Sequence, residues 1–505
     1  MRACLLALRL ADHLGLEESQ RGVLYYSGLL AWVGCHTDAY EQAKWLGDDL
    51  GSKCDSHYGY DLGRAGPAAA FLLKHVGGAG RPLRERARVT LGFLGDGRRS
   101  LAALAENHYL ATDELAQRLG LGAGVREALR QSYERWDGKG AFGLKGAEIV
   151  IASRLINLAD VVEVFRRSGG AGAAVAVARE RSGTQFDPEL VEVFCGRAPM
   201  LFSGLDDAAS WDLVIDAEPS LGQAVPGGSL DDALAAVGEF AELKSAWRMG
   251  HAPAVAGLAA GAAQTAGLPA EDVTTLRRSA LVEDLGHLGV SNAIWDKRGP
   301  LSVPEVERVR LHAYLTERML SFSPALAPLG ALAAVHHERL DGSGYPRGLS
   351  GEAISPAGRV LAAADVYQAL IESRPHRPAR SAEAAASELR GEVAARRLDG
   401  DAVDAVLRAA GHRVRRRKEW PSGLTGREVE VLRLVARGLS NKEIAGALHI
   451  SAKTAGTHVE HIYAKIAVSN RAQASLFAMR HGLMTDVAPD PRPAASPRRS
   501  GERPM

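Results

Sequence analysis

The chain has few cysteines, few aromatic residues and almost no net charge. It carries four cysteines among 505 residues, with no CxxC pair: Cys4, Cys35, Cys54 and Cys195. So few thiols exclude a disulfide scaffold and favour a reducing, cytoplasmic setting. The net charge is +1, from 61 Lys+Arg against 60 Asp+Glu. That balance excludes a uniformly basic nucleic-acid-binding surface but not a local basic module.

Long hydrophobic runs are also missing. No stretch approaches the 18 or so apolar residues of a membrane span, so we expect no membrane partner. At the N-terminus, charged residues such as Arg2 and Arg9 interrupt the apolar run at helical spacing. This predicts an amphipathic core helix and not a signal peptide. The remaining composition is that of a globular protein, with 46% hydrophobic residues and a length typical of about three domains.

Helical periodicity dominates the chain. Apolar residues recur at positions i, i+3, i+4 and i+7, for example in Val255–Leu268 and Val429–Leu439. No alternating run of β-branched residues is long enough to predict a sheet. We therefore predict an all-α fold, with a disordered tail from Pro489 that is rich in proline, arginine and serine.

An internal repeat divides most of the chain into two copies of one helical unit. Five pairs of segments match in the same order: Ala11–Leu16 with Ala263–Leu268, Leu29–Cys35 with Leu281–His287, His108 with His312, Glu134–Gly140 with Glu338–Gly344, and Arg154–Asp160 with Arg359–Asp365. Agreement at five ordered places indicates duplication. The first copy carries extra sequence between Cys35 and His108.

The second copy places metal-ligand residue types where a helical core would need apolar ones. They are His251, Glu283, Asp284, His312, His336, His337 and Asp365. A lone histidine in such a helix is usually an ordinary partly buried residue, but this ordered set comes from four helices. Mixed imidazole and carboxylate ligands suit Fe, Mn or Zn, and this many ligands predict as many as two divalent ions. Two ions clamp a phosphate and activate water for in-line attack.

The string HHERLDGSGYP, His336–Pro346, resembles the signature of the HD-GYP family of metal-dependent phosphohydrolases. The resemblance covers roughly Leu243–Leu407 and implies an all-helical domain that hydrolyses cyclic di-GMP or a related cyclic dinucleotide. It implies that six of the seven residues above, all but Glu283, are metal ligands. It also implies a ligand loop that contains Asp341, Gly342, Gly344, Tyr345 and Pro346.

Three departures from the family pattern bear on activity. Glu283-Asp284 stands where the family has a His-Asp doublet. His287 stands where the family usually has a basic residue three positions later, and Trp247 stands where it often has an acidic residue one turn before His251. Glu283 remains a candidate metal ligand, and Asp284 and His287 are the candidate catalytic residues. A Glu in place of His changes charge and metal preference. The alternatives are a working hydrolase and a former enzyme kept as a ligand sensor or dimerisation scaffold.

The first copy has lost most of these residues. Ala31-Trp32 and Ser132-Tyr133 stand where the second copy has its Glu-Asp and His-His pairs. Only His108 and Asp160 persist, and two ligands are too few for a dinuclear site. We expect a scaffold or regulatory role. The position equivalent to His251 falls just upstream of Met1, so we hypothesise an internal start or a truncated copy.

The C-terminal part is basic. Between Arg413 and Arg480, 13 Lys+Arg against 5 Asp+Glu give a net charge of +8. Four short helices are predicted: Thr425–Arg437, Asn441–Leu448, about Ala452–Ile466, and Arg471–His481. A short helix, a tight turn and a longer helix are typical of a helix-turn-helix. The basic run Arg413–Lys418 adds candidate phosphate contacts.

The segment Leu424–Ile466 resembles the LuxR-type helix-turn-helix. The resemblance implies a four-helix domain that binds double-stranded DNA, usually as a homodimer. The implied DNA-binding residues are Lys453, Thr454, Thr457, His458, His461 and Lys465.

These inferences define five segments: a degenerate HD-GYP-like domain at 1–225, an HD-GYP-like domain with a partial metal site at 229–412, a basic linker at 413–422, the DNA-binding domain at 423–484 and a disordered tail at 485–505. We predict a cytoplasmic bacterial LuxR-type regulator whose second unit senses or processes a nucleotide or metal ligand. The alternative is an active cyclic dinucleotide phosphodiesterase with a DNA-binding module. A phosphate-accepting response regulator is less favoured, because no α/β receiver pattern precedes the DNA module.

Overall fold

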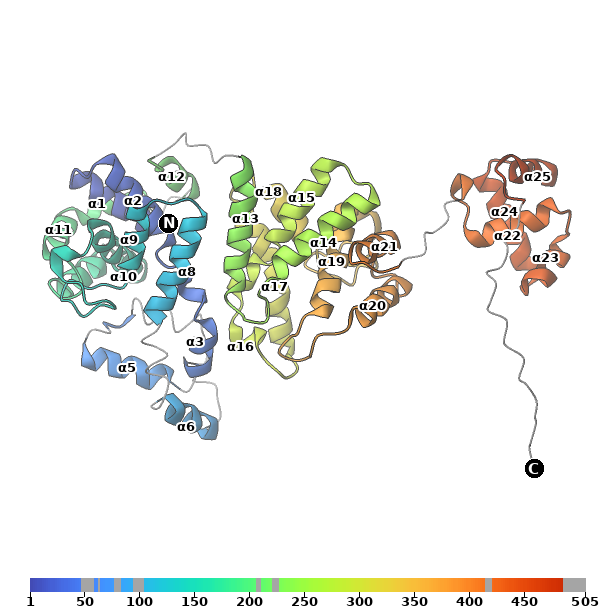
Figure 1. Cartoon of the computed structure of the whole chain (residues 1–505). Helices are drawn as coiled ribbons and strands as arrows, with labels where there is room; N and C mark the ends of the chain where they lie inside the picture. Colours follow the sequence, from blue (N-terminus) through green and yellow to red (C-terminus); the bar gives the residue numbers. More distant parts are fainter. Residues whose placement is uncertain are drawn as a thin grey trace, which may run out of the picture. The chain divides into compact units, whose positions relative to one another are not determined.

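The structure is a computed structural model that describes residues 1–46, 59–61, 64–76, 83–93, 104–205, 210–219, 227–413 and 420–484. These residues form helices and no β-strand, which confirms the all-α prediction (Figure 1). The chain divides into two compact units, Met1–Arg413 and Val414–Met505. Cys54, most of the basic linker and the C-terminal tail lie outside the described residues. No helix in the described ranges is long and apolar enough to cross a membrane.

The first half of the larger unit contains the degenerate copy. Its described helices are α1 (Arg2–His13), α2 (Glu18–Leu30), η1 (Val33–His36), α3 (Ala39–Leu46), α5 (Ala65–His75), α6 (Leu83–Gly92), α8 (Leu104–Arg118), α9 (Ala123–Arg130), η4 (Gly146–Glu148), α10 (Ile151–Glu180), α11 (Pro188–Phe202) and α12 (Ser210–Asp216). Helices α1, α2, α10 and α11 bury one shared apolar core. The N-terminal segment is a core helix as predicted, since seven residues of α1 are buried.

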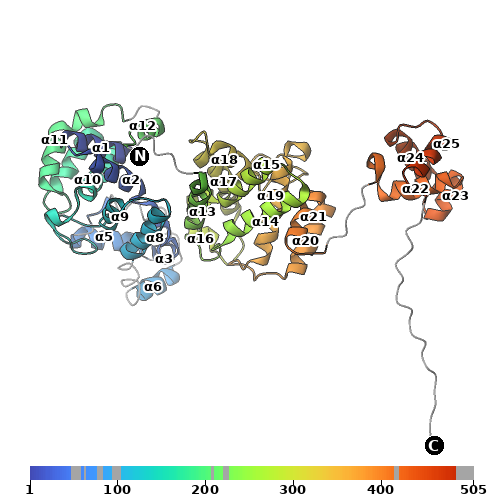
Figure 2. The same ribbon diagram turned by 45° about the horizontal axis from the view of Figure 1, so that its top comes forward.

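The second half contains the copy with the ligand-type residues. Its helices are α13 (Gly227–Glu242), α14 (His251–Ala266), α15 (Ala270–Leu281), η5 (Leu285–Gly289), α16 (Asn292–Trp295), α17 (Val303–Leu320), α18 (Ala327–Ala333), η6 (Gly351–Ala353), α19 (Pro356–Ile371), α20 (Ala382–Ala394) and α21 (Gly400–Ala409). Helix α14 packs against α15, α19 and α21 (Figures 1 and 2). Its buried face is mostly alanine, which lets neighbouring helices approach closely.

The repeated motif has the same structural role in both copies. The buried Glu338 carboxylate accepts hydrogen bonds from the backbone N–H groups of Arg347 and Leu349, each at 2.8 Å. In the first copy, Glu134 accepts equivalent bonds from the loop that follows it. The glutamate therefore ties its own loop in place by satisfying backbone donors. This explains why it persists where the ligand residues do not.

A second pair of contacts also recurs. Arg359 pairs with Asp399, the N-cap of α21, and Arg154 pairs with Asp187, the N-cap of α11. Each arginine thus joins a long helix to the start of the closing helix of its copy. The recurrence supports the duplication that the sequence indicates.

The two copies contact each other through α8 and α13. Leu115 of α8 and Phe240 of α13 share a small buried cluster. The ring of His36 in η1 lies edge-on to the Phe240 ring. His36 Nε2 also forms a hydrogen bond with the backbone oxygen of Phe240 at 2.6 Å. The first copy therefore supports the helix that leads into the site of the second.

The smaller unit is a four-helix module. Its helices are α22 (Gly426–Ala436), α23 (Asn441–Leu448), α24 (Ala452–Lys465) and α25 (Arg471–Arg480), preceded by the single turn η7 (Pro421–Gly423). Thr425 and Ser440 cap α22 and α23 in capping boxes, and Ser451 caps α24. These helices agree with the predicted ones to within one residue at each end. Their apolar faces form one core.

Candidate functional site

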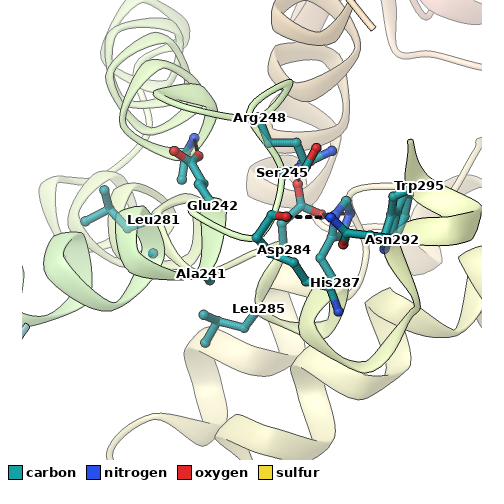
Figure 3. Close-up of a pocket in the computed structure, with 13 residues that line it drawn as sticks. Ala241, Glu242, Ser245, Arg248, Leu281, Asp284, Leu285, His287, Asn292 and Trp295 are labelled. Carbon is teal, nitrogen blue, oxygen red and sulfur yellow. Dashed lines mark hydrogen bonds and ion pairs between the residues drawn. The ribbon is translucent and has the colours of Figure 1, made fainter. Parts of the chain in front are cut away.

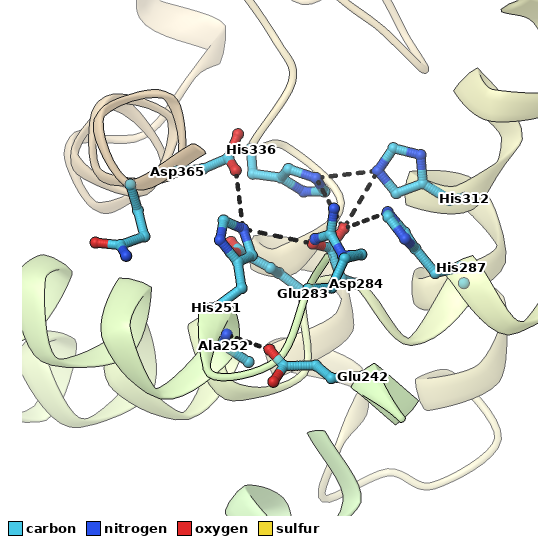
Figure 4. A network of polar contacts seen from close by, with 12 residues as sticks. Glu242, His251, Ala252, Glu283, Asp284, His287, His312, His336 and Asp365 are labelled. Carbon is cyan, nitrogen blue, oxygen red and sulfur yellow. Dashed lines mark hydrogen bonds and ion pairs between the residues drawn. The ribbon is translucent and has the colours of Figure 1, made fainter. Parts of the chain in front are cut away.

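Backbone packing brings the predicted ligand residues of the second copy together (Figure 4). His251 begins α14, Glu283 and Asp284 follow α15, His312 lies within α17, His336 and His337 follow α18, and Asp365 lies within α19. All seven are among the groups of side chains that could hold a metal ion, each group within 4.8 Å. Metal binding itself stays a prediction.

Glycine permits the close approach on which this arrangement depends. A Cβ atom on Gly286 would collide with the backbone oxygen of His312. The side-chain oxygen of Thr316 accepts a hydrogen bond from the Gly286 N–H at 2.9 Å and donates to the backbone oxygen of Glu283 at 2.8 Å. These bonds hold Asp284 beside α17.

His312 and His336 point their Nε2 atoms at each other, 3.2 Å apart. Their Nδ1 atoms face the backbone oxygens of Val309 and Ala333. Because a carbonyl only accepts, Nδ1 must carry the proton in both rings, so two Nε2 lone pairs face each other. A cation between the two rings would remove that repulsion.

The carboxylate of Asp284 completes this group. Its Oδ1 atom lies 3.4 Å from His312 Nε2 and 3.7 Å from His336 Nε2. Ligand atoms bonded to one ion at about 2.1 Å are about 3.0–3.4 Å apart. Two of the three distances lie in this range and the third, from Asp284 to His336, is 3.7 Å, so a small shift of the carboxylate would let all three groups share one ion. His337, whose ring lies 4.0 Å from that of His336, borders the group.

A second group contains His251, Glu283 and Asp365. His251 Nε2 lies 3.4 Å from Asp365 Oδ1, and its Nδ1 contacts Glu372 at 2.9 Å. Both carboxylate oxygens of Glu283 are buried without a hydrogen-bond partner among the described residues. Burial raises the pKa of Glu283 well above its usual value, and Asp365 raises it further. A buried carboxylate without a partner indicates either a proton or a missing cation.

Burial keeps four of the imidazoles neutral. It lowers the pKa of His287, His312, His336 and His337, and neighbouring positive groups add to the effect in each case. Neutral imidazole is the form that binds metal. Burial opposes ionisation of Asp365, but the adjacent His251 side chain holds its pKa well below the usual value. The residues present thus fit a divalent cation.

His287 lies beside this centre and is buried. Its Nε2 atom lies 3.1 Å from Asp284 Oδ1, and its ring stacks on Trp295 at 3.8 Å (Figure 3). Burial and the nearby arginines lower the pKa of His287 well below its usual value, so it provides no fixed positive charge for a phosphate. Its catalytic role stays a prediction.

A cavity of about 350 Å³ opens onto the centre. Asp284, His312, His337 and Asp365 line its floor, and Tyr345 and several arginines line its wall. That volume is within the range of small-molecule sites. Of the predicted ligand loop, Tyr345 reaches the cavity.

The other four loop residues do not line this cavity. Asp341 is exposed and accepts hydrogen bonds from Ser343, while Gly344 packs on the backbone of Glu338. Gly342 has a positive φ of 79°, and Pro346 follows a cis peptide bond. These residues shape the loop that carries Tyr345, and a direct ligand contact for them stays a prediction.

Two contact residues were missed by sequence reasoning. Arg248 pairs with Asp284 (Figure 3), and Glu372 holds His251. Both are ordinary charged residues outside the family string, so nothing in the local pattern marks them. In the sequence, the sign that Arg248 lies near the centre is its position, three residues before His251.

The equivalent place in the first copy is filled by aromatic rings. Trp32 Nε1 donates to Asp160, and the Trp32 ring lies 5.5 Å from that of Tyr133. The ring of Tyr133 is 5.0 Å from that of His108. The two persisting ligand-type residues are thus engaged with neighbouring side chains, as expected for a unit without metal chemistry.

The predicted DNA-binding residues lie on α24. Lys453, Thr454, Thr457, His461 and Lys465 are exposed, and His458 is half-buried. Thr454 Oγ1 contacts the cap residue Ser451 at 2.8 Å. Lys465 bonds Glu428 at 2.8 Å and the backbone oxygen of Gly423 at 3.2 Å, so its ammonium has partners within the module. Contacts with DNA stay predictions.

Comparison with known proteins identifies both modules. The model of the HD domain matches residues 236–402, and that of bacterial regulatory proteins of the luxR family matches residues 422–478. The 3'3'-cGAMP-specific phosphodiesterase 3 of Vibrio cholerae is 32% identical over 388 residues, which cover 75% of this chain and 83% of the relative. The chain belongs to the HD-GYP family. It carries, in addition, a LuxR-type DNA-binding domain.

Other relatives match the modules of this HD-GYP protein separately. The cyclic di-GMP phosphodiesterase response regulator RpfG of Xanthomonas campestris is 39% identical over 163 residues, or 32% of this chain and 41% of the relative. The response regulator protein VraR of Staphylococcus aureus is 46% identical over 79 residues, or 16% of this chain and 38% of the relative.

A crystal structure of a cyclic GMP-AMP specific phosphodiesterase of V. cholerae superimposes with a TM-score of 0.55 and 26% identity, covering 82% of this chain and 92% of that one. The covered share of this chain is larger than the second copy, so the structural similarity extends into the first copy.

Proposed function

We propose that this chain is a transcriptional regulator whose HD-GYP domain binds a cyclic dinucleotide at a divalent-metal centre, and that the state of this centre controls DNA binding. The observation that carries the proposal is the pair of facing Nε2 lone pairs beside Asp284. The luxR-family match supplies the DNA partner. We propose that the DNA-bound form is a homodimer, as is usual for this type of module.

The donor set supports the metal part of this proposal. His312, His336 and Asp284 would hold an ion of Fe, Mn or Zn, with His251, Glu283, His337 and Asp365 as further donors. When bound, such an ion neutralises phosphate charge and activates water. The imidazoles of His312 and His336 are neutral, and bonds to backbone oxygens orient them, so these two side chains lose little freedom on binding.

The cavity supports the nucleotide part. Arg339, Arg374 and Arg377 line it, and guanidinium groups pair well with phosphates. The aromatic walls Trp247 and Tyr345 offer faces on which a base can stack. The substrate class is proposed from the relatives, whose names specify cyclic GMP-AMP or cyclic di-GMP.

The alternative is a working phosphodiesterase whose DNA module only localises it. The intact imidazole group favours it, whereas Glu283 and neutral His287 are departures that weaken it. The regulator hypothesis does not require turnover, but it does require that the ligand changes DNA binding.

Metal analysis, hydrolysis and footprinting of the full chain separate the two. Wild type is compared with Asp284→Ala and with Asp272→Ala, an exposed aspartate of α15 as the control. We expect bound metal in wild type and the control and its loss in Asp284→Ala. A DNA footprint that changes with cyclic dinucleotide supports the regulator, and turnover with an unchanged footprint supports the alternative. No metal in any protein would refute both.

A further inference from the structure

Arg248 brings a fixed positive charge into the metal centre. It lies in the segment between α13 and α14, its side chain is 16% exposed, and its guanidinium contacts Oδ2 of Asp284 (Figure 3). A guanidinium group stays protonated in proteins at neutral pH. A guanidinium cannot ligate a metal, so it competes with one for that oxygen.

The two oxygens of Asp284 face different neighbours. Oδ1 faces His287, His312 and His336 at 3.1–3.7 Å. Oδ2 faces Arg248, and His251 Nε2 lies 3.7 Å from it. A two-ion centre in which each oxygen of this carboxylate binds one ion needs Oδ2 as well as Oδ1. The contact with Arg248 therefore removes the oxygen on the side of His251 and leaves the other free for an ion.

The charges of the side chains around the centre also favour a single divalent ion. Glu283 stands where the family pattern has a neutral imidazole, and so it adds a negative charge beside Asp365. When a cation is bound and all three carboxylates are ionised, Glu283, Asp284, Asp365 and Arg248 together carry a net charge of −2. One divalent ion balances that charge, whereas a second would leave an uncompensated buried charge of +2.

We propose that Arg248 takes the place of one metal ion, so that this chain holds a single divalent ion on His312, His336 and Asp284. The charges of Glu283 and Arg248 then compensate each other. The inference rests on the proposed metal centre and specifies its stoichiometry.

The test is metal stoichiometry in the full chain. Wild type, Arg248→Ala, the double variant Arg248→Ala/Glu283→His and the control Arg277→Ala are loaded with Mn²⁺, dialysed and analysed. Arg277 pairs with Asp231 on the surface of α15 and does not line the cavity. Electron paramagnetic resonance distinguishes an isolated Mn²⁺ ion from a coupled pair without any activity measurement. Circular dichroism and the melting temperature verify folding of each variant.

We expect one ion per chain and the signal of an isolated ion in wild type and Arg277→Ala. Arg248→Ala should gain a weaker second ion, and the double variant should hold two and give the coupled signal. Two ions in wild type would overturn the role of Arg248 but leave the metal centre standing. One ion in all four proteins would also overturn it, while no ion in any of them would overturn the proposed centre itself.

Discussion

At the scale of single residues, burial determines the chemistry of both copies. In the second copy it keeps four imidazoles neutral, and the buried Glu283 carboxylate has no hydrogen-bond partner among the described residues. In the first copy the corresponding space holds Trp32 and Tyr133, and Asp160 remains as a buried carboxyl. Burial raises the pKa of Asp160 to about 6, although the bond from Trp32 opposes this.

Asp160→Asn tests that buried carboxyl. Between about pH 4 and pH 6 the folded state retains a proton that the unfolded state has released, so the free energy of unfolding falls as pH rises. Above pH 6 the buried Asp160 carboxylate lowers the free energy of unfolding by its full amount, about 3 kcal/mol at most. We expect Asp160→Asn to unfold at higher urea concentration than wild type at pH 7.5 and to show little difference at pH 4.5. The exposed Asp12→Asn is the control. An equal difference at both pH values would contradict the raised pKa.

Two lysines of α24 should differ in their effect on DNA binding. Lys453 is exposed at the start of the helix, whereas Lys465 pairs with Glu428. We expect Lys453→Ala to reduce the slope of log K against log salt by about 0.9, as for the loss of one phosphate contact. Lys465→Ala should change the slope less and instead lower the melting temperature of the module. Titrations of DNA at several salt concentrations measure the slopes, and equal slopes for both variants would refute the distinction.

At the scale of elements, the site depends on how closely η5 approaches α17. The absence of a side chain at Gly286 lets the backbone of η5 lie against that of His312. Gly34 allows the same approach of η1 to α8 in the first copy. The two copies thus share a close backbone contact, although the first copy lacks most of the ligand-type residues.

Gly286→Ala should separate Asp284 from His312. The added Cβ meets backbone atoms, which cannot move aside as a flexible side chain can. We expect a loss of at least about 2 kcal/mol in the free energy of unfolding and a loss of bound metal. Gly257→Ala is the control, since it lies in α14 with open space around it and should gain up to about 1 kcal/mol. Normal metal content in Gly286→Ala would show that the close approach is dispensable.

At the scale of the whole molecule, the proposed metal centre and the luxR-family domain lie in separate compact units. A ligand that binds only one unit stabilises only that unit. Tyr367 of α19 bonds His412 at 2.9 Å, close to the end of the larger unit. Helix α19 therefore contains Asp365 and also contacts the segment that leads toward the DNA module.

Removal of metal should affect one of two melting transitions. With an ion at about 100 times its Kd, the larger unit gains about 3 kcal/mol. We expect a chelator to lower the melting temperature of that unit by several degrees and to leave the transition of the DNA module unchanged. Differential scanning calorimetry of wild type and Asp284→Ala measures this. A chelator effect of equal size in Asp284→Ala would show that the ion binds elsewhere.

The sequence by itself determined the helical class, the duplication, the four helices of the DNA module and the ligand residue types. Each of these depends on local periodicity, capping or a short string of residues, all of which are readable along the chain. It did not reveal Arg248, Glu372 or the aromatic filling of the first copy, because these contacts join residues far apart in sequence. The protonation states of the imidazoles and of Glu283 were decided by the tertiary structure, since burial sets them and burial is a property of the packed fold.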